Sequence, residues 1–143
     1  MITKEITIQR APHARKLATW LFICTSFVFI MILLGGTTRL SHAGLSIVEW
    51  KPLLGIFPPL SETDWNEVFV KYQSFSEYQK RNVGMTLAEF KPIFWLEYIH
   101  RLWGRLLGVV FLLPFLYFWY CGTINRRLAQ KLLGVFFLGA LQG

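Results

Sequence analysis

The chain has 143 residues, of which 54% are hydrophobic and 17% aromatic. This composition is too apolar for an ordinary soluble domain and indicates a membrane protein. The net charge is +7, but the basic residues cluster beside apolar runs rather than among exposed aromatic residues, which argues against a nucleic-acid-binding protein. Both cysteines belong to apolar runs or their ends, so no disulfide framework is expected.

Three apolar runs divide the chain. Residues 1–16 form a basic N-terminus, and residues 17–36 are long enough to cross a bilayer as a first transmembrane helix. A cleaved signal peptide is the alternative, but the run is long for one and no small-x-small cleavage site follows it. A second transmembrane helix is predicted at residues 99–121, followed by a loop at 122–131. Residues 132–143 begin a third helix that is too short to span, so we expect the front part of a longer protein.

Charge predicts the orientation of these helices. Residues 1–16 hold four basic residues and one acid, and the 122–131 loop holds three basic residues and no acid. Residues 41–98 instead carry seven acids against five basic residues. By the positive-inside rule the N-terminus and the loop face the cytoplasm, or the matrix in an organelle. We therefore predict an all-α integral membrane protein, a transmembrane helix bundle in the lipid bilayer of the cell inner membrane or the mitochondrial inner membrane, with residues 37–98 outside.

Local signals predict helices within the outer segment. The sequence SETD at 61–64 is typical of a helix start with an acid at N3, and TLAE at 86–89 is a stronger capping box. The second box can open one long helix that continues through Glu97 and His100 into the second span, with Pro92 near its first turns. Aromatic residues here suit a membrane-interface belt. They are Trp50, Trp65, Phe90, Phe94, Trp95 and Trp103.

Glu97 and His100 stand one helical turn apart where the second apolar run begins. Residues three or four positions apart share a helix face, so Arg101 and Gly104 point roughly the same way. Ionisable groups at a membrane boundary are costly and usually functional. An imidazole beside a carboxylate and guanidinium groups suits an anionic, metal-bearing ligand such as heme.

Each of these residues has a functional and a structural interpretation. His100 is a candidate heme-iron ligand, or an interfacial histidine bonded to a carbonyl or a headgroup. Glu97 can orient the imidazole or accept protons from a substrate, and it can equally form an i,i+4 ion pair with Arg101. His42 follows the first span, and an ordinary loop role is favoured there over reach to the site.

Basic and small residues near the outer boundary complete the candidate site. Arg39, Arg101 and Arg105 can pair with heme propionates, or they can snorkel to lipid phosphates. Gly104 and Gly108 form a G-x-x-x-G pair, which is typical of close helix packing and would also leave space for a flat macrocycle.

Several motifs together resemble the N-terminal part of the heme A synthase family, in its mitochondrial and proteobacterial subgroup. They are GGTTRL (35–40), GLS (44–46), WKPL (50–53), PPLS (58–61), FKPIFW (90–95), EYIHRLWGR (97–105) and LGALQG (138–143). The absence of cysteine from the outer segment also fits this subgroup.

The resemblance implies an eight-helix membrane enzyme built from two similar four-helix halves. Such an enzyme oxidises a ring methyl of heme O to the formyl group of heme A, for cytochrome oxidase, and holds a heme b cofactor in one half. The resemblance further implies that His100 is a heme-iron ligand and that Glu97 takes part in the chemistry. Heme O synthase and cytochrome oxidase assembly factors would be its partners, and a homo-oligomer stays open.

Two features depart from the family pattern. The sequence SHA at 41–43 replaces the usual small polar residues, and the family's second N-terminal histidine and its heme b site would lie beyond Gly143. We therefore expect the whole protein to be an oxidoreductase and this stretch alone to be inactive. The alternatives are a membrane b-type cytochrome, which carries electrons without altering its heme, and a non-catalytic fragment.

Overall fold

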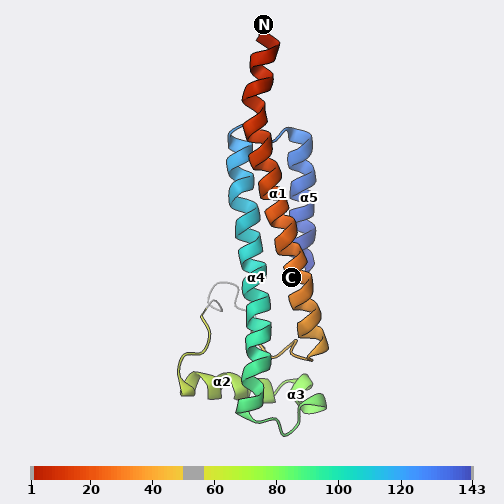
Figure 1. Ribbon diagram of the computed structural model, residues 1–143. Helices are drawn as coiled ribbons and strands as arrows, with labels where there is room; N and C mark the ends of the chain where they lie inside the picture. The colour runs from red at the N-terminus through yellow and green to blue at the C-terminus, as the bar shows by residue number, and fades with distance from the viewer. Residues whose placement is uncertain (1, 50–56, 143) are drawn as a thin grey trace. The chain divides into compact units, whose positions relative to one another are not determined.

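The computed structural model describes residues 2–49 and 57–142, with side chains from residue 14 onward. These residues contain no strand and form α1 (Ile2–Leu40), α2 (Glu62–Gln73), α3 (Ser76–Arg81), α4 (Leu87–Tyr120) and α5 (Arg126–Gln142), as Figure 1 shows. The predicted all-α class is confirmed. The WKPL motif at 50–53 and Trp50 lie outside the described residues.

Helices α1 and α4 are each long and apolar enough to cross a membrane. The qualifying stretches are Ala14–Leu40, with 27 residues, and Leu87–Tyr120, with 34. Helix α4 begins where the TLAE sequence predicts, because the Thr86 amide donates to Glu89 Oε2 at 2.8 Å and the Glu89 amide donates to Thr86 Oγ1 at 3.4 Å. One continuous helix through the candidate site is therefore confirmed.

Helix α5 begins at Arg126, before the expected position 132. The Leu128 amide donates to Asn125 Oδ1 at 2.8 Å, which is the hydrogen bond of an N-cap. Residues 126–131, predicted as loop, are therefore helical, because this cap sets the helix start rather than the first residue of the apolar run.

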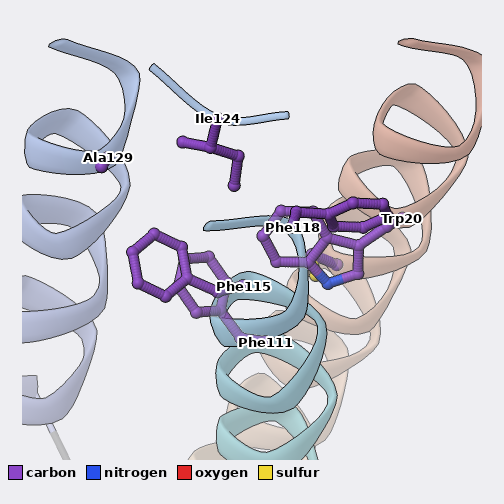
Figure 2. Close-up of a cluster of buried hydrophobic side chains, with 7 residues drawn as sticks. Trp20, Phe111, Phe115, Phe118, Ile124 and Ala129 are labelled. Atoms are coloured by element: carbon purple, nitrogen blue, oxygen red, sulfur yellow. The ribbon is translucent and has the colours of Figure 1, made fainter. Parts of the chain in front are cut away.

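The chain divides into two compact units. Unit 1 comprises Met1–Ile30 and Gly104–Gly143, and unit 2 comprises Met31–Trp103. Unit 1 has an apolar core drawn from α1, α4 and α5, whose aromatic side chains gather in Figure 2. Its buried members are Trp20, Cys24, Phe111, Phe115, Phe118, Ile124 and Ala129.

A proline explains how Trp20 is held in this core. Pro114 lacks an amide hydrogen, so the carbonyl of Val110, four residues earlier in α4, has no helical donor. The Trp20 Nε1–H donates to that carbonyl at 2.9 Å. The indole ring also packs against Phe111 and Phe118, with ring centroids 5.4 and 5.6 Å away. One side chain thus fills the core and satisfies the open backbone acceptor.

Unit 2 has an aromatic core in which α2 packs on the first turns of α4. Trp65 and Tyr72 of α2 lie buried with Phe90, Phe94 and Tyr98 of α4. Three residues assigned to an interface belt, Trp65, Phe90 and Phe94, are in this cluster instead, because α2 and α4 bury them against each other. Trp95 is 39% exposed.

Two polar contacts fix α2. Ser61 and Asp64 form the predicted capping box, in which the Ser61 amide donates to Asp64 Oδ2 at 3.0 Å and the Asp64 amide donates to Ser61 Oγ at 3.1 Å. These bonds, led by the one from the Ser61 amide, hold the pKa of Asp64 below its ordinary value. At the other end, Tyr72 is fully buried, its hydroxyl accepts from Asn82 Nδ2 at 2.6 Å, and burial raises the pKa of its phenol.

Candidate functional site

The candidate site in unit 2 starts at the C-terminal end of α1. The His42 amide donates to the Arg39 carbonyl at 3.2 Å and the Ala43 amide donates to the Thr38 carbonyl at 3.0 Å. This pair of bonds is a Schellman motif, and His42 has a φ of +50° at the position that usually carries glycine. The motif turns the chain sharply out of the helix and sends residues 44–47 toward α4.

A second left-handed residue completes this turn. Leu45 has a φ of +71°, which is rare for a bulky side chain and costs free energy. Its conformation brings the next two residues to Glu97 of α4, where the Ser46 hydroxyl and the Ile47 amide donate to Oε2 at 2.7 and 3.0 Å. These hydrogen bonds hold the strained turn in place.

Glu97 is buried, with 5% of its surface exposed, and its carboxylate is fully engaged. Arg101 donates to Oε1 from Nη2 at 2.6 Å and from Nε at 3.0 Å. The same guanidinium donates to the Ile47 carbonyl at 2.9 Å. The predicted i,i+4 ion pair is confirmed, and it joins α4 to the loop after α1 as well as linking two turns of one helix.

His100 faces α1 rather than Glu97. A Cβ built on Gly35 would lie 3.3 Å from His100 Nε2 and 4.0 Å from both Cδ2 and Cε1, so Nε2 is the ring atom nearest to Gly35. The hydrogen bonds described for the Glu97 carboxylate go to Ser46, Ile47 and Arg101 and not to the imidazole. In this structure Glu97 therefore does not orient His100 directly.

The other candidate residues lie in varied surroundings. Arg39 is exposed in the last turn of α1, within unit 2. Arg105 is partly buried, and it lies with Gly104 and Gly108 on the part of α4 that belongs to unit 1. A Cβ on Gly108 would meet nothing within 4 Å, so among the described residues no neighbour packs closely there.

His42 lies on the outer segment and not at the Glu97 carboxylate. Arg81 Nη1 donates to its Nδ1 at 2.8 Å, and both side chains are exposed. This geometry agrees with the loop role favoured from sequence.

Two residues of the site were not selected from sequence, Gly35 and Ser46. Both lie inside motifs noted there, GGTTRL and GLS, but nothing local marks a glycine as the neighbour of an imidazole or a serine as the partner of a carboxylate 51 residues away. No group of three or more His, Cys, Asp or Glu side chains that could hold a bare metal ion occurs in the described ranges. A heme iron differs, because the macrocycle supplies four ligands and the protein needs only axial ones.

Long apolar helices and a buried ionisable pair beside a histidine define a class, the helical membrane proteins. A family model described as cytochrome oxidase assembly protein, COX15-CtaA, matches residues 18–143. The chain belongs to this family, as the resemblance of its motifs predicts. No solved structure matches it.

Curated relatives agree with the family match. The chain is 60% identical over 129 residues to the heme A synthase of Paramagnetospirillum magneticum, covering 90% of this chain and 36% of the relative. It is 53% identical over 137 residues to the heme A synthase of Nitrosospira multiformis, covering 96% and 38%. For the heme A synthase of Nitrosomonas eutropha the values are 55% over 142 residues, 99% and 40%. The chain therefore spans about two fifths of the length of these relatives.

Proposed function

We propose that the whole protein is a heme A synthase, a membrane oxidoreductase that converts a ring methyl of heme O into the formyl group of heme A. The observation that carries this proposal is 60% identity to a relative of that name over 90% of the chain. The family match over residues 18–143, which include the whole EYIHRLWGR motif, adds to it.

In this proposal His100 is an axial ligand of the substrate iron. The donor chemistry fits, because a neutral imidazole is a common heme ligand and this one lies partly buried on a long apolar helix. Arg39 and Arg105 would pair with the propionates, and the spacing of Gly104 and Gly108 along α4 would leave room for the macrocycle. Arg101 is the least suited of the three arginines, because Glu97 and the Ile47 carbonyl already engage its guanidinium.

Glu97 is the proposed acidic group of the chemistry. Its position one turn from His100 and its burial support this role. To take up a proton at Oε2 it would give up the bond from the Ser46 hydroxyl, which can donate instead to the Ile93 carbonyl 3.3 Å away. The guanidinium at Oε1 would keep the side chain in place meanwhile.

The wider setting follows from the same proposal. The whole protein would hold heme b as a cofactor at residues outside this chain, and it would receive heme O from heme O synthase and act with cytochrome oxidase assembly factors. The site would face the outer side of the inner membrane, because the basic residues gather in the N-terminus and around residues 126–131.

Heme extraction tests this function. The whole protein, coexpressed with a source of heme O, should produce heme A that mass spectrometry identifies in the membrane extract. His100→Ala should abolish the conversion, whereas His42→Asn, which removes an exposed imidazole but keeps a residue that tolerates the left-handed conformation, should leave it intact. Recovery of heme O alone would contradict the proposal. Unchanged heme B with reversible redox behaviour would favour the b-type cytochrome instead.

A further inference from the structure

The imidazole of His100 stands too close to α1 to bind heme iron through Nε2. The Cβ position of Gly35 is 3.3 Å from that nitrogen, and the glycine Cα is one bond, about 1.5 Å, from that position, so it lies within about 4.8 Å of Nε2. A metal bound to imidazole sits about 2 Å from the nitrogen. Atoms across a flat macrocycle must stay about 3.5 Å farther away. About 5.5 Å is therefore needed, and the backbone of α1 is nearer than that.

Gly35 is what permits this close approach. A side chain at position 35 would give a contact with Nε2 tighter than ordinary van der Waals contacts, so the ring would have to move. The next residue, Gly36, differs, because a Cβ there would meet nothing within 4 Å. The imidazole therefore accounts for a glycine at position 35 but not for one at position 36.

We propose that the His100 imidazole packs against Gly35 when no heme is bound, and that the ring leaves this contact when Nε2 binds heme iron. The inference rests on the proposed ligand role of His100 and deepens it. The contact with Gly35 and the bond to iron exclude each other. The apparent affinity for heme is therefore reduced in proportion to the fraction of molecules in which the ring is free of this contact. Gly35 is in this sense a positioning residue for the ligand.

The contact between the His100 imidazole and Gly35 is tested without heme. In the heme-free whole protein in detergent, Gly36→Ala should raise the unfolding midpoint, because alanine favours a helix over glycine. Gly35→Ala should raise it less or lower it, because its methyl group meets the ring. In a His100→Ala background, Gly35→Ala should become as stabilising as Gly36→Ala. If the two alanines shift the unfolding midpoint equally in the wild-type background, or if their difference persists without His100, the proposed contact is wrong.

Hemin titration tests the link to heme binding. The probe is hemin added to the heme-free protein, and the measured quantity is the part of the absorption change that His100→Ala removes. Gly35→Ala should tighten this His100-dependent binding roughly fivefold, and Gly36→Ala should not change it. A weaker or unchanged affinity in Gly35→Ala would overturn the competition. If His100→Ala removes no spectral change, the ligand role fails together with the competition, while the heme-free comparison still decides the contact.

Discussion

The two units of the chain differ in the kind of side chains that each one buries. Among the described residues, the buried side chains of unit 1 are apolar, with Trp20 donating its one polar hydrogen to a backbone carbonyl. Unit 2 buries Thr38, Ser46 and Glu97 as well as its aromatic cluster. Apolar packing tolerates many arrangements of similar volume, whereas a buried carboxylate accepts only one set of donors. Glu97 and His100, the two proposed active residues, belong to unit 2, where buried polar groups restrict the arrangement of the chain.

Loss of the buried Glu97 carboxylate from unit 2 should cause the largest change in the free energy of unfolding. Glu97→Ala leaves the Ser46 hydroxyl, the Ile47 amide and the Arg101 guanidinium without their acceptor. We expect the free energy of unfolding to fall by roughly 3 kcal/mol, since breaking a buried pair strands the remaining charge. Chemical denaturation in detergent measures this value.

The matched control for that change is Glu62→Ala, which removes an exposed carboxylate from the first turn of α2. It should alter the free energy of unfolding by less than about 0.5 kcal/mol. If Glu97→Ala costs no more than this control, the polar interior of unit 2 does not stabilise the fold.

The Trp20 hydrogen bond should give an intermediate effect in unit 1. Trp20→Phe keeps an aromatic ring but leaves the Val110 carbonyl without a donor, at a cost of about 1–2 kcal/mol. In a Pro114→Ala background the cost should shrink, because the new amide at position 114 can donate to that carbonyl. Trp119→Phe, on a half-exposed side chain, is the control. The same cost of Trp20→Phe in both backgrounds would show that the proline does not create the acceptor.

The two Schellman motifs should give the smallest and most direct comparison. Gly122 ends α4 in unit 1 with a φ of +68°, and His42 ends α1 in unit 2 with a φ of +50°. Gly122→Ala should lower the free energy of unfolding by about 1 kcal/mol, whereas His42→Gly should raise it by about 0.5 kcal/mol. The lost Arg81 contact matters little because both partners are exposed. Thermal unfolding midpoints that shift in the same direction would contradict this pairing.

Local signals predicted much of the secondary structure. The capping boxes at Ser61 and Thr86 set helix starts because each needs only residues three positions apart. The pair of Glu97 with Arg101 was foreseeable for the same reason, since helix geometry brings them together. The start of α5 was misplaced because an apolar run marks where a helix becomes buried, not where Asn125 caps it.

By itself, then, the sequence determined the all-α class, the caps of α2 and α4, the apolar spans and the family, and it supplied the residues proposed to bind heme. Only the tertiary structure decided that Ser46 and Ile47 bond to Glu97, that α2 buries aromatic residues suited to an interface, and that Gly35 receives the imidazole of His100. The physical reason is separation along the chain. A cap or a helix-face pair forms among neighbours a few residues apart, whereas these contacts join segments that are far apart in the sequence. The bonds from Ser46 and Ile47 to Glu97 also follow a left-handed turn at His42 and Leu45 that redirects the backbone.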